Sequence, residues 1–496
     1  MLRASDPSRY GRDSDATDLD QTLPRYHRPA GGRLGDAIPF FWDGTWHVFY
    51  LDYRPEFFHH TPPGARQTSW AHVSSPDLVH WQRQPDAIAP GPEGAVDSGS
   101  CATGSVFAYD GTFHLFYTGR YFTTRGQRRE TICHATSTDL LAWQKDPANP
   151  IARPDPERYA LEHWRDPFVY WQPQAEEFWM VLTAEHHHGA PGRTGCVAVL
   201  AANDLHTWQR RAPLWSPALA PNHECPDVFW WGDWWYLVVS HGGRTVYRMA
   251  RAPGGPWLAP AVDTFDDHFF YAAKTAGDER RRVLFGWLAS KAGDCDAGSR
   301  EWGGNLVARE LLQAPDGTLW PACPAEYVIR DAPARRATPV ACIGEWQTVA
   351  GGLEHAWNAG FACALLDAGA ADCQLRTIIA WQPGTKAVGL FLRVHDGPAR
   401  GYALRLEPGA GAVTFGRVTE TGRIVDELRR SAPDLASLAG GCRCVVTLSG
   451  SVVDVFLGNR VALTARCHDF RGTHAGVFVE EGGAAFRDLA LVPLPP

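Results

Sequence analysis

The sequence lacks the long apolar runs, the basic clusters and the paired cysteines that mark several large classes of protein. No stretch approaches the roughly 18 uninterrupted apolar residues of a membrane-spanning helix, so no membrane partner is expected. The net charge is −8, only four residues are lysine and no basic run of five residues occurs, which excludes nucleic acid as the expected partner. The twelve cysteines form no Cys-x-x-Cys pair, so they predict neither a zinc ribbon nor a dithiol redox site.

The N-terminal segment also lacks an apolar stretch. Residues 1–21 are polar and acidic, without the apolar centre of a secretory signal peptide, so we expect a cytoplasmic protein with free, buried thiols. Residues 1–24 are predicted to form a polar N-terminal extension. The remaining composition, 45% hydrophobic and 21% charged, is that of an ordinary globular protein, and it leaves the oligomeric state open.

A repeated motif organises the first 330 residues. Ser-x-Asp-Leu-x-x-Trp occurs at residues 75–81 and 137–143, and a looser copy at 202–208 keeps the Asp-Leu pair and the Trp. A second repeated element is an aromatic strand, which occurs five times and is twice entered through Asp-Gly, a hairpin signal. Such a repeat with little helical periodicity predicts a five-bladed β-propeller over residues 25–330, with five four-stranded sheets arranged radially. An open β-sandwich is the alternative.

The composition changes after residue 330. Residues 331–341 contain two prolines and no apolar pattern, so they are predicted to be a linker. Residues 342–496 alternate apolar and polar positions with period two between Gly, Pro and Asp turns, which predicts a C-terminal β-sandwich. The expected fold is therefore all-β, a propeller followed by a sandwich, and the sandwich shows no group of catalytic type.

Three acidic residues stand in settings unlike the Asp-Gly turns. Asp36, Asp166 and Glu224 are each followed within three residues by Pro and then by an apolar strand. They are therefore predicted to lie at one level in blades one, three and four. Glycoside cleavage needs one protonated and one ionised carboxyl, and a third can bind sugar hydroxyls. Arg165, beside Asp166, suits a carboxylate that stays ionised.

The motifs around these acids resemble those of glycoside hydrolase family 32, the invertases, fructanases and fructosyltransferases. Arg165-Asp166-Pro167 is similar to its Arg-Asp-Pro motif, and residues 224–227 are similar to its Glu-Cys-Pro-Asp motif. Residues 70–81 resemble its Trp-Gly-His…Asp-Leu-Val-His-Trp segment. The resemblance runs from about residue 26 to residue 496, and so includes the terminal sandwich.

The resemblance implies an enzyme that cleaves or transfers the terminal β-fructofuranosyl unit of a small fructoside with retention of configuration. It makes Asp36 the nucleophile, Glu224 the general acid/base and Asp166 the stabiliser of the transition state. The pKa of Glu224 is expected to be raised by neighbouring carboxylates and partial burial. The resemblance implies no cofactor and no metal. The residues expected to contact the substrate are Arg165, Trp70, Ile38, Asp52, Thr103, Ser105, Tyr271 and Trp302.

The first motif departs from the family pattern. The family's Asn-Asp-Pro-Asn-Gly is here Gly35-Asp36-Ala37-Ile38-Pro39, so two amides beside the nucleophile position are lost. We therefore expect a less polar pocket, with apolar contacts from Ile38 and Leu51. Sucrose should bind weakly, other fructosyl disaccharides or anhydrides should be better substrates, and restoring Asn at positions 35 and 38 should improve activity on sucrose.

Two other functions remain open at this point. An arabinofuranosidase-like propeller glycosidase with inverting chemistry would need a wider separation of the carboxyl groups. A non-catalytic sugar-binding relative would account for the altered first motif, although all three acids are kept. The run Glu185-His186-His187-His188 is not interpreted as a metal site, because adjacent histidines on an extended chain point to alternate faces.

Overall fold

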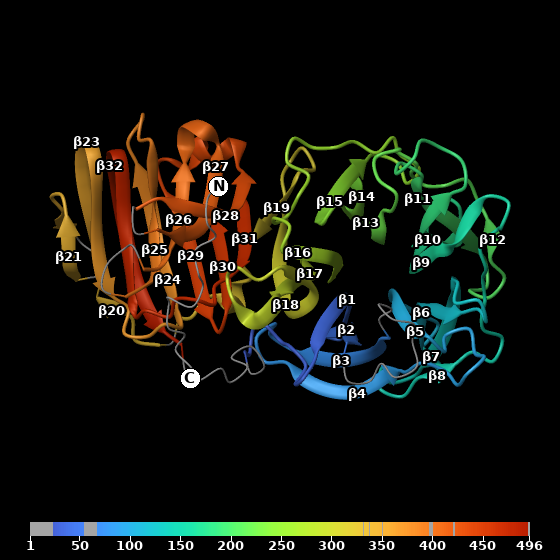
Figure 1. Cartoon of the computed structure of the whole chain (residues 1–496). Helices are drawn as coiled ribbons and strands as arrows, with labels where there is room; N and C mark the ends of the chain where they lie inside the picture. The colour runs from blue at the N-terminus through green and yellow to red at the C-terminus, as the bar shows by residue number, and fades with distance from the viewer. Residues whose placement is uncertain are drawn as a thin grey trace, which may run out of the picture.

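The computed structural model describes residues 23–53, 67–330, 332–336, 338–349, 351–395, 400–419 and 422–494. Two all-β bodies lie side by side in Figure 1, with the sheets of a propeller around a common centre on the right and a sandwich on the left. The predicted fold class, a five-bladed propeller followed by a β-sandwich, is confirmed. Among the described residues, no helix combines the length and the apolar character needed to cross a membrane.

The blades follow one another along the chain. Blade 1 consists of β1 (Arg33–Trp42), β2 (Thr45–Tyr53), β3 (Ser69–Ser75) and β4 (Gln82–Ile88). Blade 2 consists of β5 (Ser100–Tyr109), β6 (Thr112–Phe122), β7 (Arg128–Ser137) and β8 (Gln144–Lys145). Blade 3 consists of β9 (Tyr159–Gln172), β10 (Glu177–His186), β11 (Gly195–Ala202) and β12 (Gln209–Arg210). In each blade the first strand is innermost and the last is outermost.

Blades 4 and 5 differ slightly from the predicted four-stranded pattern. Blade 4 consists of β13 (Glu224–Trp231), β14 (Trp234–His241) and β15 (Arg244–Ala250), and isolated bridges from β15 to Leu258 and Thr264 stand where a fourth strand is expected. Blade 5 consists of β16 (Phe270–Gly277), β17 (Arg282–Lys291), β18 (Arg300–Gln313) and β19 (Leu319–Ala322), with short 3-10 helices at Ala292–Asp294 and Ala325–Tyr327. The pairing of β18 with β1 at Gly304 and Leu34 joins blade 5 to blade 1 and closes the ring.

The sequence repeats form the turns of the blades. Asp43-Gly44 and Asp110-Gly111 both have positive φ at each residue, as a two-residue hairpin turn requires, and they connect β1 to β2 and β5 to β6. In the Asp-Leu motif, the carboxylate of Asp139 accepts hydrogen bonds from the backbone N–H groups of residues 141 and 142. The motif Trp then packs edge-on against an aromatic ring of the preceding blade, Trp143 on Phe49.

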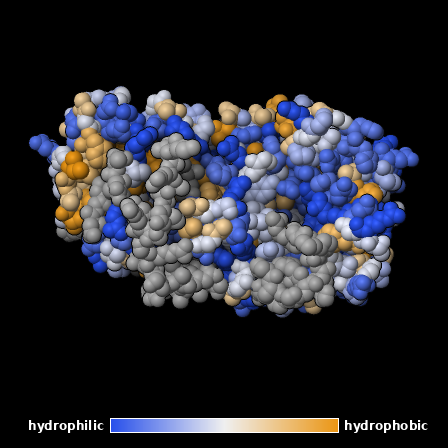
Figure 2. Space-filling view, viewed as in Figure 1, coloured by the Kyte–Doolittle hydropathy of each residue, from blue (hydrophilic) through white to orange (hydrophobic). Residues whose placement is uncertain are grey.

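The sandwich follows blade 5 and is built from one extended set of antiparallel strands. Its strands are β20 (Arg335–Arg336), β21 (Pro339–Ile343), β22 (Gln347–Val349), β23 (Gly352–Asp367), β24 (Cys373–Trp381), β25 (Ala387–Val394), β26 (Tyr402–Glu407), β27 (Ala412–Val418), β28 (Ile424–Ser431), β29 (Cys442–Ser449), β30 (Val452–Leu457), β31 (Val461–Arg466) and β32 (His474–Pro493). Short 3-10 helices occupy Pro408–Ala410 and Pro433–Leu438. Figure 2 shows a mostly hydrophilic propeller on this face and an apolar area at the outer edge of the sandwich, towards β21 and β23.

Pairing with the sandwich begins before residue 342. Within the stretch predicted to be a linker, β20 pairs with β32, and β21 pairs with β23. We therefore propose that the sandwich starts near residue 335. The predicted N-terminal extension lies almost wholly outside the described residues. The two bodies share a buried ion pair, in which Arg309 of β18 lies 2.8 Å from Asp454 of β30.

Candidate active site

Every innermost strand carries a β-bulge at the same level. The pairing between the first and second strand shifts register there in every blade, and the pairing in blade 3 has a second shift nearer the start of β9. A bulge re-aims a side chain out of the regular alternation of a strand. The residues at or beside these shifts are Asp36, Thr103, Asp166, Glu224 and Tyr271. The bulges place the three acids at one level in blades 1, 3 and 4.

Asp36 is held through both of its carboxylate oxygens. The indole Nε1 of Trp287 donates a hydrogen bond to Oδ1 over 3.0 Å, and the hydroxyl of Thr103 donates to Oδ2. The Cys225 thiol lies 3.6 Å from Oδ2. Burial raises the pKa of Asp36 above its ordinary value, against the opposing effect of the bonds from Thr103 and Trp287. These donors fix the carboxylate while the residue stays partly exposed.

Asp166 is the most deeply buried of the three acids. Its Oδ2 accepts hydrogen bonds from the backbone N–H of Cys225 and from the hydroxyl of Thr183, each over 3.0 Å. Both Asp166 and Cys225 have positive φ, 60° and 54°, which is uncommon for residues other than Gly and accompanies the bulges. Burial, opposed by Arg165 and assisted by Asp36, raises the pKa of Asp166 to about 6.

Glu224 has the opposite electrostatic setting. Arg165 donates to its Oε1 over 2.8 Å, and the hydroxyl of Tyr271 donates to its Oε2 over 2.6 Å. Burial by itself raises the pKa of Glu224, but Arg165 and Tyr271 outweigh it and hold the pKa below its ordinary value. The expected rise of this pKa is therefore wrong for the unliganded site. Neighbouring carboxylates alone would raise this pKa, but Arg165 bonds to Glu224 directly.

Arg165 acts as a bridge within the site. It is buried, and besides Glu224 it contacts Glu130 at 3.4 Å and the Asp166 carboxylate at 3.7 Å. Glu130 in turn accepts hydrogen bonds from Arg120. Arg165 was predicted to contact substrate, and these contacts show that it also positions the acids. Glu130 was not predicted, and no local motif marks it. The bond from Trp287 to Asp36 was not predicted either.

Four further residues that were predicted to contact substrate divide into two groups. Thr103 and Tyr271 touch the acids directly, as described above. Ser105 is buried and accepts a hydrogen bond from the backbone N–H of Val169, which connects blades 2 and 3. Asp52 is buried on β2 opposite Leu34, where its charge helps to raise the pKa of Arg83. Their contact with a substrate remains a prediction.

Trp70 and Ile38 do not fit the predicted role. The exposed fractions of their side chains are 0% and 1%, and both pack in one cluster with Phe49 and Leu51. The Trp70 indole N–H is already bonded to the carbonyl of Ala102. We therefore assign these residues to packing between blades 1 and 2, in place of sugar contacts. The family motif predicted their position, but their burial depends on the neighbouring blade.

Trp302 occupies the space beside the nucleophile position where a side chain at residue 35 would lie. A Cβ added to Gly35 would stand 2.0 Å from Cη2 of Trp302. The Trp302 ring also packs against the rings of Trp287 and Tyr53, with centroids 5.9 and 5.7 Å apart. Gly35 and Trp302 are therefore complementary, and an aromatic surface replaces the amide of the family motif.

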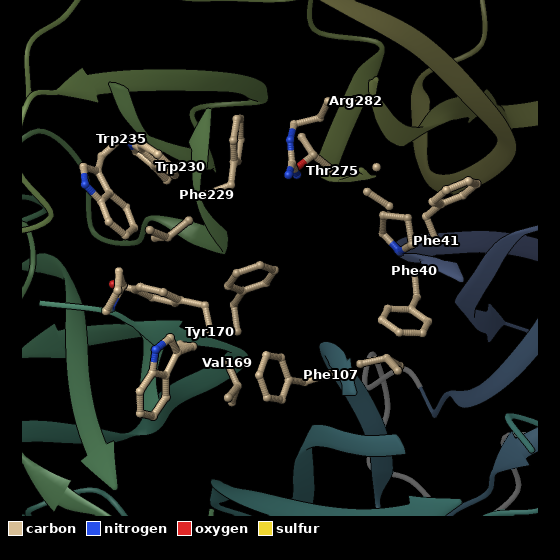
Figure 3. A pocket seen from close by; sticks show the side chains of 18 of the residues that line it. Phe40, Phe41, Phe107, Val169, Tyr170, Phe229, Trp230, Trp235, Thr275 and Arg282 are labelled. Carbon is tan, nitrogen blue, oxygen red and sulfur yellow. The ribbon is translucent and has the colours of Figure 1, made fainter. Parts of the chain in front are cut away.

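A cavity of about 530 Å³ lies on the same inner strands a few residues beyond the acids. Figure 3 shows aromatic side chains around it, among them Phe40, Tyr170 and Phe229. Arg282 and Thr275 stand on one side, joined by a hydrogen bond of 2.9 Å. None of the three acids lines this cavity, so we locate the candidate active site at the bulges.

Comparison with known families and curated proteins gives consistent matches. The model described as "Glycosyl hydrolases family 32 N-terminal domain" matches residues 37–318. The sucrose-6-phosphate hydrolase of Escherichia coli is 30% identical over 316 residues, covering 59% of this chain and 62% of the relative. The raffinose invertase of Escherichia coli is 28% identical over 322 residues, covering 60% and 63%. In these alignments the chain spans about six tenths of the length of the curated relatives.

Solved structures share the fold over nearly the whole chain. The sucrose-6-phosphate hydrolase from Lactobacillus gasseri superposes with a TM-score of 0.70 at 19% identity, covering 97% of this chain and 98% of that one. The GH32 beta-fructofuranosidase of Bombyx mori gives a TM-score of 0.67 at 20% identity, covering 96% and 97%. These likenesses extend through both the propeller and the sandwich.

Proposed function

The chain belongs to glycoside hydrolase family 32, and we propose that it cleaves or transfers the terminal β-fructofuranosyl unit of a small fructoside. The observation that carries this proposal is the position of Asp36, Asp166 and Glu224 at the bulges of three inner strands, each with its own set of hydrogen-bond donors. The relatives named above, sucrose-6-phosphate hydrolases and a raffinose invertase, support a fructoside as the substrate class.

The proposed reaction is a double displacement. A carboxylate oxygen of Asp36 attacks the anomeric carbon of the fructosyl unit, and the bond to the leaving oxygen breaks as Glu224 gives that oxygen a proton. Glu224 then takes a proton from water or a sugar hydroxyl, which attacks the same carbon and releases Asp36. Asp166 would bind ring hydroxyls while positive charge builds on the sugar. Trp287 and Thr103 would hold Asp36 in line for the attack.

Arg165 and Tyr271 would set the pH range of this reaction. In the unliganded site they favour the ionised form of Glu224, whereas the first step needs the protonated form. Substrate binding must therefore shift the proton towards Glu224. Asp36 and Asp166, whose pKa values are raised, are the neighbouring groups able to share that proton. The three acids would titrate as one coupled group.

Removing the Tyr271 hydroxyl tests this electrostatic account. In Tyr271→Phe one of the two hydrogen bonds that lower the pKa of Glu224 is lost, so that pKa rises. Activity disappears as pH increases through the pKa of the acid, so the alkaline limb of the kcat/KM profile should move to higher pH. The matched control is Tyr170→Phe, since the Tyr170 hydroxyl lies on the same propeller with no described partner. The account would be contradicted if the alkaline limb moved only in Tyr170→Phe, or if it moved to lower pH in Tyr271→Phe.

Gly35 and Trp302 are expected to set specificity together. Gly35→Asn alone should lower stability and activity, because its Cβ would overlap the Trp302 ring. In Gly35→Asn/Trp302→Ala the amide has room, and a recovered hydrogen bond to a fructose hydroxyl is worth about 1–3 kcal/mol, or roughly 5- to 150-fold in kcat/KM. Sucrose kinetics of the double variant are compared with those of Trp302→Ala. Equal kinetics, or a fully stable Gly35→Asn, would count against this role for the pair.

Restoring Asn at position 38 is no longer expected to help. Ile38 is fully buried between blades, so an amide there would be buried among apolar side chains. An unpaired buried amide costs about 1–3 kcal/mol. The weak binding of sucrose expected from the altered motif stays a prediction, and it now depends on position 35 alone.

A product screen tests the proposed function. The purified chain is incubated with sucrose, sucrose 6-phosphate, short inulin and levan oligomers, and difructose anhydrides. Free fructose indicates hydrolysis, and longer or cyclic products indicate transfer. An Asp36→Asn preparation purified in parallel controls for contaminating invertase. Binding of these sugars with no product from any of them would overturn the proposal and favour a sugar-binding protein.

A further inference from the structure

Blades 1 and 2 each carry a pair of histidines at the same place. His47 of β2 and His72 of β3 lie with Nδ1 and Nε2 3.0 Å apart, and His114 of β6 and His134 of β7 repeat this contact at the same distance. His72 stacks on Phe49 and His134 stacks on Phe116, so both pairs join the aromatic packing inside the blades. The pair alone is therefore part of the repeated packing of a blade.

Only the pair in blade 2 has further ligand groups next to it. Three residues after the motif Trp, blade 1 has Gln84, which faces His72 in the register, whereas blade 2 has Asp146. The motif of the following blade contributes a second position, two residues after its Asp. The residue at this position is Leu141 at the junction of blades 1 and 2, and His206 at the junction of blades 2 and 3. The junction of blades 1 and 2 therefore carries an amide and a leucine, whereas the junction of blades 2 and 3 carries a carboxylate and an imidazole.

These groups are close enough to share one ion. Nδ1 of His134 lies 3.1 Å from Oδ2 of Asp146, and Nδ1 of His206 lies 4.0 Å from the same oxygen. The three ligand atoms all lie within 4.8 Å of one another. Ligand atoms at about 2.0–2.2 Å from a tetrahedral zinc ion stand roughly 3.3–3.5 Å apart. The separation of 3.1 Å is already close to that geometry, and the exposed His206 side chain would have to move closer to complete it.

The surrounding hydrogen bonds orient the same atoms. The backbone N–H of Ala148 donates to Oδ1 of Asp146 over 2.8 Å, which leaves Oδ2 for the site. In the tautomer where Nε2–H of His134 donates to Nδ1 of His114, the Nδ1 lone pair of His134 points at the Asp146 carboxylate. A histidine that binds a metal through one ring nitrogen usually donates a hydrogen bond from the other, as Nε2 of His134 does in this tautomer.

We propose that His134, Asp146 and His206 bind one divalent transition-metal ion, Zn²⁺ from the ligand chemistry, which ties blade 2 to blade 3. Two imidazoles and one carboxylate suit zinc better than Mg²⁺ or Ca²⁺, which prefer oxygen ligands. The exposed fraction rises from 1% for His134 through 16% for Asp146 to 60% for His206, so an ion can enter from solvent and keep a water ligand. None of the three residues contacts the acids of the candidate active site, and the proposal is independent of the proposed function.

Calorimetric titration of the metal-free chain with ZnCl₂ tests the site. The wild type should bind one ion, and His206→Ala and Asp146→Asn should each weaken that binding at least tenfold. His80→Ala is the matched control, because His80 is an exposed histidine 2.7 Å from Asp77 in blade 1 without a third ligand. Its zinc binding should equal that of the wild type.

Thermal unfolding gives a second readout. Zn²⁺ should raise the Tm of the wild type and of His80→Ala, because the ion joins two blades, and should leave the Tm of His206→Ala unchanged. MgCl₂ at the same concentration should have no effect on any of them. His206 is exposed, so its replacement is expected to fold. Equal zinc binding by the wild type and His206→Ala, or no zinc-dependent rise in the wild type, would overturn the proposal.

Discussion

Asp36→Asn is expected to lower turnover by about 10⁴-fold or more while leaving the fold intact, which corresponds to roughly 5.5 kcal/mol of lost transition-state stabilisation. The amide cannot form the covalent bond to the sugar, so the first displacement is blocked. The fold should survive because Asn has nearly the shape of Asp, its carbonyl oxygen can still accept from Trp287, and the Thr103 hydroxyl can accept from the amide.

The measurement is the steady-state rate on the best substrate of the product screen, together with the Tm of each variant. Thr118→Ser is a suitable control, since its hydroxyl accepts from the backbone N–H of Asp166 and Ser can keep that bond. Near-normal turnover in Asp36→Asn, with Asp166→Asn and Glu224→Gln equally harmless, would remove the catalytic assignment altogether.

Glu224→Gln should lower activity strongly, and by an amount that depends on the leaving group. General acid catalysis contributes typically 10²–10⁴-fold, and it is needed most when the leaving oxygen is a poor leaving group. Activity on sucrose should therefore fall far more than activity on an aryl fructoside, whose phenolate leaves with little protonation. The alkaline limb of the pH profile should also disappear, because it reports the ionisation of this acid.

The comparison is the ratio of kcat/KM on the two substrates in the wild type and in Glu224→Gln. Arg165 contacts Glu224 but cannot supply the proton, so Arg165→Lys should change kcat/KM on the two substrates by more similar factors. Equal losses on sucrose and on the aryl fructoside in Glu224→Gln would indicate a role in binding and would exclude Glu224 as the acid.

The architecture could be predicted from the sequence because its signals are local. Asp43-Gly44 specifies its hairpin within two residues, and the carboxylate of Asp139 bonds to backbone groups two and three residues away. The level of the acids was also predictable, since Asp36, Asp166 and Glu224 each precede a proline at an inner-strand bulge. In these cases neighbouring residues alone determine the conformation.

The electrostatics and the contacts of the site could not be predicted, because they join residues far apart in the chain. Trp287 bonds to Asp36 across 251 positions, and Arg165 reaches Glu224 across 59. The burial of Trp70 depends on blade 2, although its motif was recognised. The glycine at position 35 is explained by Trp302, which lies 267 positions away and fills the space beside it.

The proposed zinc ligands illustrate the same limit. The histidines at 186–188 are adjacent in the sequence, whereas His134, Asp146 and His206 come from three separate segments. No spacing rule for metal sites connects them. They come together because consecutive blades repeat one geometry. The equivalent positions at the junction of blades 1 and 2 carry Gln84 and Leu141, so the ligand groups are specific to the junction of blades 2 and 3.

The most direct test of the account is to trap the fructosyl-enzyme. Glu224→Gln is mixed with β-fructofuranosyl fluoride, whose leaving group needs little protonation, so the first displacement proceeds while the second, which needs the base, is slow. Mass spectrometry of the intact chain and its peptides should show one added fructosyl unit, esterified to Asp36. An ester on another residue, or steady release of fluoride with no covalent adduct, would contradict the assignment of Asp36 as the nucleophile.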